Sequence, residues 1–197
     1  VYSAQIVAQY LKSKEDFLNI IQVKKLYKNL LDRMRINPIP ITNETKNLFK
    51  YIETQQIFEE NAENILENIK IIQINYEIDY STMIKIKEEK KEQTVICKKV
   101  IYTSEDMELY GNEIPKEVNI IDINCFRECD FTSFVIPSTV TELRKCCFYG
   151  CENLTNLVIP EKWSVYGNKL FNNESHLKSF KIPTTIKIIN EKEYIHE

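Results

Sequence analysis

Glycine is scarce in this sequence, and histidine is scarcer. Three glycines in 197 residues exclude the glycine-rich loops that cradle phosphates and the tight-hairpin barrels that need glycine at positive φ. The two histidines are His176 and His196. Glu174 and Ser175 adjoin His176 in the chain, whereas the members of a catalytic triad converge from different segments. We therefore expect no catalysis and no cofactor, and we interpret the His176 segment as a solvated turn.

Long apolar runs and a strong excess of one charge are also missing. No window reaches 18 consecutive apolar residues, so the sequence predicts no transmembrane helix. The first 30 residues are interrupted by Gln, Lys and Asp, which argues against a secretory signal there, although the chain begins with Val1 and an upstream segment can be missing. A formal net charge of −3 gives no general attraction to nucleic acid or to an anionic membrane. We expect a cytoplasmic protein, with the cell surface as the alternative.

The stretch from residue 114 to residue 183 repeats itself. Four Ile-Pro pairs follow one another at steps of 22, 23 and 23 residues, and a phenylalanine stands eleven places after each of the first three prolines. A period of about 20 to 29 residues is typical of a stacked leucine-rich solenoid. The pairs end at Pro115, Pro137, Pro160 and Pro183, and the phenylalanines are Phe126, Phe148 and Phe171.

Apolar residues recur at the same distances from each proline, so every repeat is expected to bury the same columns. The segment Leu-x-x-Leu-x-Ile-Pro is expected to be a short strand, which the proline closes because it cannot donate to a ladder. Residues 148–154 are expected to return the chain as a turn or a short helix. The columns are Leu109, Phe131, Leu154 and Leu177; Asn112 (an imperfect member), Phe134, Leu157 and Phe180; Ile114, Ile136, Ile159 and Ile182; Val118, Val140, Trp163 and Ile186; and Ile121, Leu143, Tyr166 and Ile189.

One unit is the most complete. Val140 and Leu143 are followed by Cys147-Phe148-Tyr149-Gly150-Cys151 and then by Leu-Thr-Asn-Leu-Val-Ile-Pro at residues 154–160. This pattern resembles the BspA-like leucine-rich repeats, and the resemblance covers residues 109–189, with looser matches in the neighbouring units. It implies an α/β leucine-rich repeat solenoid of short parallel strands, used for recognition and without catalysis.

Four of the six cysteines follow the phase of the repeats. Cys125 and Cys147 share the tenth place after the proline, where the next unit has Leu, and Cys129 and Cys151 share the fourteenth. A column that accepts either Cys or Leu is typical of a core, where a free Cys packs as a small hydrophobe. We therefore expect reduced core thiols; the alternatives are a zinc site formed by the two Cys-x3-Cys pairs, or disulfides.

Residues 3–35 are expected to form two helices. Ser13 and Asp16 have the spacing of a capping box, and after them apolar residues recur at three and four places through Met34. Asn37-Pro38-Ile39-Pro40 is expected to end the second helix, because a proline disfavours helix in the residue before it. The first helix is expected to present Ile6, Val7, Tyr10 and Leu11 on one face, and the second Phe17, Ile20, Ile21, Tyr27, Leu30 and Leu31.

Part of this opening has the pattern of a known docking motif. A Tyr-Leu pair is followed by Asp-Phe-Leu and by Val-Lys-Lys, and this order resembles an F-box, although Lys24 stands where that family often has Cys. The resemblance implies that the helices dock on a Skp1-type adaptor. The alternative is a helical cap over the open end of the solenoid, which needs the same amphipathic pattern. The residues that would contact the adaptor are Tyr10, Leu11, Asp16, Phe17, Leu18 and Val23.

Between residues 41 and 106 the expected elements alternate without a fixed period. Asn43 is expected to cap a helical turn through Phe49, and residues 52–58 have an extended pattern. Residues 69–78 alternate as a half-buried strand, residues 81–93 are expected to form a helix, and residues 95–102 another strand. We expect a helical F-box-like or capping segment at 1–40, degenerate repeats at 41–106 and BspA-like repeats at 107–197.

Alternation along the repeat strands indicates a binding surface. Leu157 and Ile159 are expected to face the core, which turns the residues between and before them outward. We call the outward positions of three successive units the recognition strip; they are mostly polar and nearly uncharged. The expected function is recognition of a protein target, as an adaptor of a ubiquitin ligase or, alternatively, as a cell-surface or secreted adhesion module. The recognition strip comprises Ser133, Val135, Asn156, Val158, Ser179 and Lys181.

Overall fold

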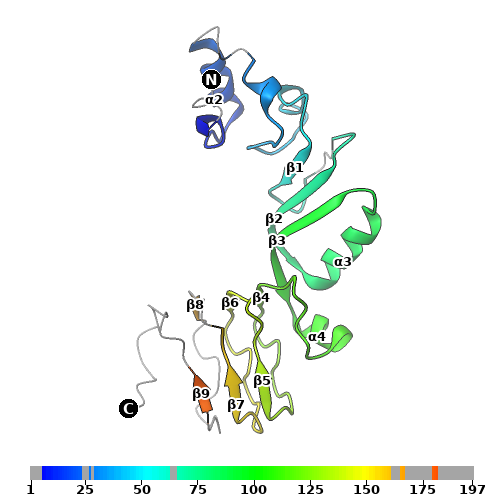
Figure 1. Ribbon diagram of the computed structural model, residues 1–197, viewed down its shortest axis with the longest axis vertical. Coiled ribbons are helices and arrows are strands. Elements are labelled where there is room, and N and C mark those ends of the chain that lie inside the picture. Colours follow the sequence, from blue (N-terminus) through cyan, green and yellow to red (C-terminus); the bar gives the residue numbers. More distant parts are fainter. Residues whose placement is uncertain are drawn as a thin grey trace. The chain divides into compact units, whose positions relative to one another are not determined.

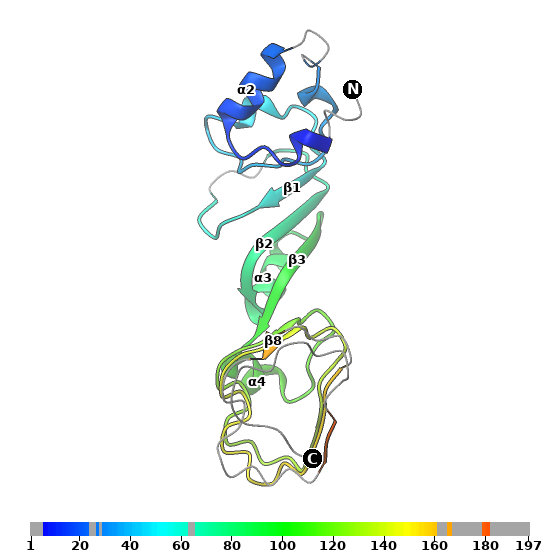
Figure 2. The ribbon, with the colours of Figure 1, turned by 90° about the vertical axis from the view of Figure 1, so that its left-hand side faces the viewer.

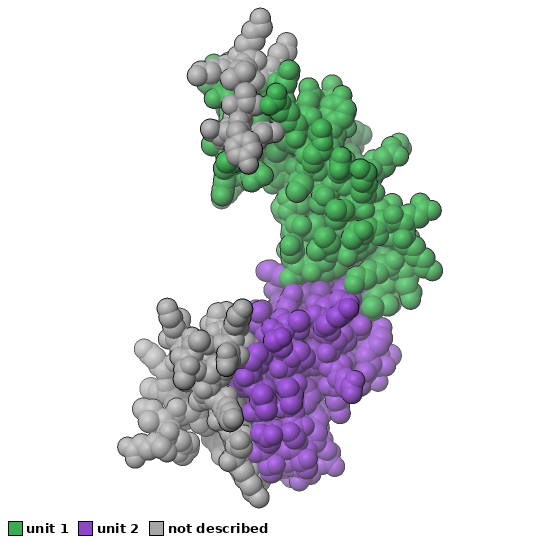
Figure 3. Space-filling view, in the orientation of Figure 1, with its two compact units in different colours: residues 1–76, 84–98 green, residues 77–83, 99–197 purple. Residues whose placement is uncertain are grey.

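The computed structural model describes residues 6–23, 27, 29–62, 66–160, 165–166 and 179–181. The chain forms two compact units, which are coloured separately in Figure 3. Unit 1 comprises residues 1–76 and 84–98, and unit 2 comprises residues 77–83 and 99–197. The chain passes from one unit to the other within β2 (Ile71–Asp79), α3 (Tyr80–Glu89) and β3 (Thr94–Tyr102).

Helix α2 (Lys14–Val23) begins in unit 1 where the sequence predicts it. The Asp16 N–H donates to Ser13 Oγ at 3.1 Å, and the Ser13 N–H donates to the Asp16 carboxylate at 3.1 Å. This reciprocal pair satisfies N–H groups that have no partner inside the helix. The hydrogen bonds from Ser13 and Lys12 also lower the pKa of Asp16, because they favour its charged form.

The apolar period from Phe17 to Met34 does not correspond to one helix. Helix α2 ends at Val23, and a 3₁₀ turn at Leu31–Arg33 follows before the chain becomes extended at Met34. Phe17, Leu30 and Met34 are all buried, and Phe17 packs edge-on against Phe49 with ring centroids 5.6 Å apart. The prediction of a continuous helix is wrong because separate helical turns around one core show the same spacing of apolar residues.

A parallel sheet follows in unit 1. After a 3₁₀ turn at Lys46–Leu48, β1 (Thr54–Ile57) pairs with β2 from Thr54↔Ile71 to Ile57↔Ile74. β3 lies on the other side of β2 in the strand order. The predicted alternation in β2 is confirmed, since Ile72 and Ile74 are buried and the residues between them are only partly covered. The helix and the strand predicted next are α3 and β3.

In unit 2 each repeat contributes one strand to each of two parallel sheets (Figure 1). The first sheet has the order β3-β4-β6-β8 in this unit, and the second has the order β5-β7-β9. Successive turns of the chain overlie one another when the unit is viewed as in Figure 2. The strands are β4 (Ile120–Ile121), β6 (Glu142–Leu143), β8 (Val165–Tyr166), β5 (Ser133–Val135), β7 (Asn156–Val158) and β9 (Ser179–Lys181).

The predicted columns form the core of unit 2. Val118, Val140 and Ile121 are fully buried, and Leu143 is 1% exposed. The strands predicted before Pro137, Pro160 and Pro183 are β5, β7 and β9, which confirms this part of the prediction for three repeats, whereas residues 111–113 before Pro115 form no strand. The strands β4 and β6, by contrast, were expected only as buried columns, because two residues are too short for alternation to be visible.

Leu109, the expected first member of its column, is not a core residue. It is 70% exposed, because helix α4 (Ser104–Tyr110) stands where later repeats have the turn that leads into their strand. This helix begins at Thr103, whose Oγ1 accepts a hydrogen bond from the Asp106 N–H at 3.1 Å, while the Asp106 side chain accepts from the Thr103 N–H. The Thr-x-x-Asp spacing of residues 103–106 is the signal in the sequence for this capping box.

The turns of successive repeats share a backbone conformation. Asn124 and Cys146, which are equivalent residues, have φ of 58° and 60°, and the next equivalent pair, Glu128 and Gly150, has φ of 56° and 72°. At Gly150 the turns approach closely, since a Cβ there would lie 2.7 Å from Glu128 Cγ. One scarce glycine is therefore placed where two stacked turns leave little room for a side chain.

Part of the sequence-based interpretation concerns residues outside those that the structure describes. This applies to the later members of the columns and to both histidines. They are Trp163, Leu170, Phe171, Glu174, His176, Leu177, Ile182, Ile186, Ile189 and His196.

Candidate recognition surface

The first four residues of the recognition strip lie on the outer face of β5 and β7. Alternation buries Phe134 and Leu157 and turns their neighbours outward, as predicted. Ser133 is exposed, Asn156 is half-buried, and the exposed fractions of Val135 and Val158 are 64% and 38%. The strip continues on the backbone of β9, where Ser179 pairs with Asn156 and Lys181 with Val158.

Register places equivalent side chains of the strip beside one another. Ser133 pairs with Asn156, and Asn156 Nδ2 donates to Ser133 Oγ at 3.2 Å. Val135 pairs with Val158, so two exposed valines are neighbours on the same face. The outer face of β5 and β7 therefore carries a hydroxyl–amide pair beside a pair of valines, and neither strand has a charged residue. Such a face is complementary to an uncharged surface that offers both hydrogen bonds and methyl groups.

A hollow of about 400 Å³ adjoins β5. Ser133 and Val135 contribute to its wall, which connects it with the recognition strip. Glu113 is its single charged residue, and within the described residues it has no ion pair. No sequence pattern indicates this hollow, whose other lining residues are Asn112, Ile114, Phe131, Phe134 and Pro137.

An arginine joins three carboxylates on the first sheet of unit 2. Arg144 follows β6, and its guanidinium lies 2.7 Å from Glu77, 3.1 Å from Glu142 and 3.2 Å from Asp122. The hydrogen bond from Arg144 lowers the pKa of Glu77, and Lys99 at 3.8 Å acts in the same direction. The cluster ties together residues of β2, β6 and the end of β4, and we interpret it as a support for the stack.

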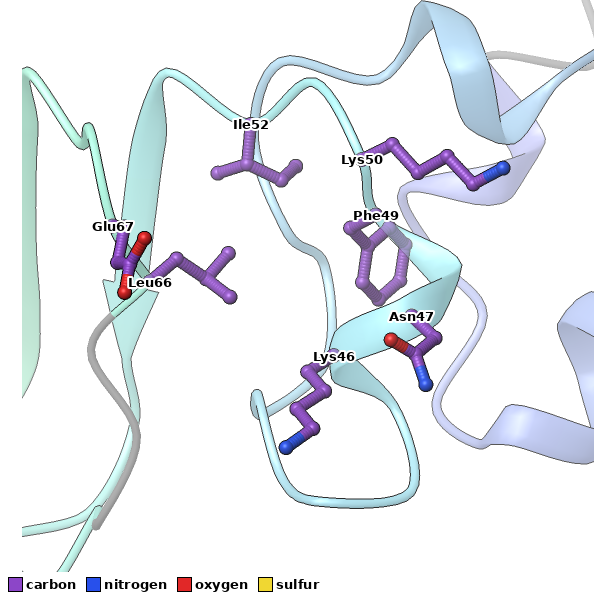
Figure 4. A pocket seen from close by; sticks show the side chains of 7 residues that line it. All are labelled: Lys46, Asn47, Phe49, Lys50, Ile52, Leu66 and Glu67. Atoms are coloured by element: carbon purple, nitrogen blue, oxygen red, sulfur yellow. The ribbon is translucent and has the colours of Figure 1, made fainter.

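Unit 1 contains a second hollow, of about 470 Å³ (Figure 4). Ile52, on the same loop as Phe49, and Leu66, from a separate segment, project toward the Phe49 ring, so the wall between these three side chains is apolar. Lys46 and Lys50 contribute charge at its border, together with Glu67 and Asn47. Two lysines and one carboxylate around an open apolar wall do not by themselves specify a reaction.

The residues expected to contact an adaptor are divided between core and surface. Phe17 is fully buried against Phe49, so that it is not available to a partner, and Asp16 caps α2. Tyr10 and Val23 are 77% and 70% exposed, and Leu18 is 39% exposed. Leu11 is half-buried. The expected apolar face of the first helix is not covered either, because Ile6 and Val7 are about half exposed and Ala8 is the buried residue.

Three of the four cysteines expected in core columns are buried, namely Cys125, Cys147 and Cys151, whereas Cys129 is half-buried. All six cysteines are free. Cys125 Sγ donates to the Thr103 carbonyl at 3.4 Å, and Cys151 Sγ donates to the Phe126 carbonyl at 2.9 Å, so two thiols bond to the backbone of the preceding turn. Burial raises the pKa of Cys147 well above its usual value and that of Cys151 to about 11.

Two other kinds of site were sought among the described residues. No group of three or more His, Cys, Asp or Glu side chains there could hold a metal ion. No helix in that part of the chain is long and apolar enough to cross a membrane.

Comparison with known families bears on the same unit. The profile of one family, described as "BspA type leucine rich repeat region", matches residues 94–196 in six copies. These residues are just over half of the chain. The chain belongs to this family. The BspA-type match begins at β3, earlier than the residues 109–189 expected from the columns, because the stretch from β3 through α4 has no Ile-Pro unit.

The BspA-type match leaves residues 1–93 outside, and nothing found there supports the F-box resemblance. No curated protein and no solved structure matches the chain.

Proposed function

We propose that this BspA-type chain is a non-catalytic recognition module, a solenoid whose recognition strip binds a protein target. The observation that carries the proposal is the exposed pair Val135 and Val158, held in register beside the Ser133–Asn156 hydrogen bond. Aligned strands give such side chains fixed positions, which lowers the entropy cost of binding. Exposed valines on adjacent strands have no role in the core that would explain them.

The test compares partner retention by two variants of the full chain. Partners are first trapped by photo-crosslinking from Val158 and identified by mass spectrometry, and a purified partner is then used for titration. Val135→Asp with Val158→Asp should weaken its binding by at least about tenfold, because the partner must desolvate two new charges. Ile123→Asp is the matched control, since Ile123 is 51% exposed and follows β4, a strand of the other sheet. Equal affinity of both variants for every partner would contradict the proposal.

Two settings for this recognition remain to be distinguished by experiment. The adhesion setting needs only the repeats, whereas the adaptor setting also needs the N-terminal helices to bind a Skp1-type protein. The exposure of Tyr10, Leu18 and Val23 favours some partner at these helices. Leu18→Asp is the suitable variant for a Skp1-type pull-down, because Phe17→Asp would disrupt the core. Failure of the wild-type chain to retain the adaptor would leave adhesion or another interaction as the setting.

A further inference from the structure

Strand β5 has an edge that no other strand of the described chain covers. It pairs with β7 alone, at one end of the order β5-β7-β9. In a parallel ladder, alternate residues direct their N–H and C=O groups to opposite edges. The Asn156 N–H donates to the Thr132 carbonyl and the Ile136 N–H donates to the Val158 carbonyl, so the even-numbered residues of this segment face β7.

The main-chain groups of Ser133 and Val135 therefore face away from β7. Within the described residues, no hydrogen bond is found for the N–H or C=O of either residue. Two donors and two acceptors at strand spacing are the pattern that an added strand recognises.

The place of the absent neighbour is occupied by a hollow. One repeat earlier in the chain, the equivalents of residues 133–135 are Gly111, Asn112 and Glu113. They form no strand. Helix α4 extends to Tyr110, so the chain enters residues 111–113 directly from a helix, whereas the later repeats enter their strands from a turn. Asn112 and Glu113 instead border the open hollow of about 400 Å³ beside β5.

The hollow specifies the chemistry of a guest strand. Its inner wall includes Phe131 and Phe134, and Leu157 on β7 continues the column of Phe134, so an inward-facing bulky apolar side chain is required. Glu113 favours a basic residue nearby. Because every pairing in this sheet is parallel, a parallel guest continues its geometry.

We propose that the free edge of β5 binds an extended segment of a partner protein as an additional parallel strand, with an apolar side chain in the hollow and a basic residue near Glu113. This inference rests on the proposed recognition function and specifies its mode. Affinity comes from main-chain pairing with Ser133 and Val135, and selectivity comes from the hollow.

The test titrates the full, ¹⁵N-labelled chain with the peptide acetyl-Lys-Thr-Leu-Thr-Leu-Thr-Lys-amide. The expected result is a change in the amide resonances of Ser133 and Val135, with slower hydrogen exchange at both. In a parallel guest the Leu N–H groups face β5, so N-methylation of both Leu residues should weaken binding by at least about tenfold. N-methylation of the Thr residues should change it by less than about threefold. Equal binding of all three peptides, or loss with the N-methyl-Thr peptide instead, would overturn the proposal.

A protein variant gives an independent result. Val135→Pro removes the N–H that faces the guest and leaves the ladder with β7 intact, since an edge strand tolerates proline at such a position. It should reduce peptide affinity at least about tenfold, whereas Val135→Ala, which keeps the N–H, should reduce it less than about threefold. Peptide binding unchanged in Val135→Pro, with a native spectrum elsewhere, would overturn the proposal. A second outcome would also overturn the proposal: the chain binds no peptide, and it dimerises with rising concentration unless Val135→Pro is present. The edge of β5 would then pair with a second copy of the chain.

The same variant separates this inference from the proposed function. A native partner that is lost by Val135→Asp with Val158→Asp but kept by Val135→Pro would uphold recognition through the strip and overturn pairing at the edge. A partner that none of these variants affects would overturn both.

Discussion

The rings of Phe126 and Phe148 stack on each other with an interplanar angle of 11° and centroids 5.6 Å apart. They are equivalent residues of successive repeats, and both are buried to 1% exposure or less. Phe134 contacts both rings, with centroids at 4.7 Å and 5.4 Å. A repeat cannot cover its own phenylalanine, so the stack of rings makes each unit depend on the next.

Phe148→Ala should lower the free energy of unfolding by about 3–5 kcal/mol, the usual cost of truncating a buried aromatic residue. Urea denaturation followed by circular dichroism measures it. Tyr149→Ala is the neighbouring control, because Tyr149 is 37% exposed and its ring faces Arg127 at the surface. A loss below about 1 kcal/mol for Phe148→Ala would show that the ring is not a core element.

Gly150→Ala should destabilise the chain by about 1–2 kcal/mol, because alanine is strained at a φ of 72° and its Cβ would contact Glu128. Glu128→Ala should recover part of this loss in the double mutant, because it removes the Cγ atom that the new Cβ would contact. The measurement is a double-mutant cycle in urea. Strict additivity of Gly150→Ala and Glu128→Ala would mean that the two turns do not touch.

The Glu77–Arg144 pair should make stability depend on acid pH. Arg144 lowers the pKa of folded Glu77, so the pair's contribution is fully present above the unfolded pKa of about 4.3 and is lost as pH falls through the lower folded value. Glu77 is 39% exposed at its side chain, so the contribution should stay below about 1 kcal/mol. Urea midpoints of wild type and Glu77→Gln between pH 3 and pH 7 should differ at pH 7 and converge at pH 3. A constant difference would indicate that packing, not charge, explains the effect.

Cys125 and Cys147 should resist alkylation in the folded chain, because both thiols are buried and burial raises the pKa of each. Iodoacetamide at pH 8, followed by peptide mass spectrometry, should modify the half-buried Cys97, Cys129 and Cys146 first. In urea all six should react at similar rates. Equal rates in the native state would contradict the assignment of Cys125 and Cys147 to the core.

Residue types at fixed phase were sufficient to predict much of unit 2. Phe126, Phe148, Val118 and Val140 are buried as their columns require, and the outward positions of β5 and β7 follow from alternation. The N-terminal segment was predicted less well. The spacing from Phe17 to Met34 is compatible with one helix or with separate turns, and the core that decides between them includes Phe49, which lies far along the chain.

The sequence by itself determined the repeat, its period, its core columns and the thiols that belong to them, because stacked units must bury equivalent residues. Only the tertiary structure decided where the stack has an uncovered edge. Thr103 and Asp106 begin a helix whose extent reaches Tyr110, and residues 111–113 consequently do not pair with β5. Whether a segment pairs with a strand depends on where its neighbours bring it, and periodicity along the chain contains no information on that.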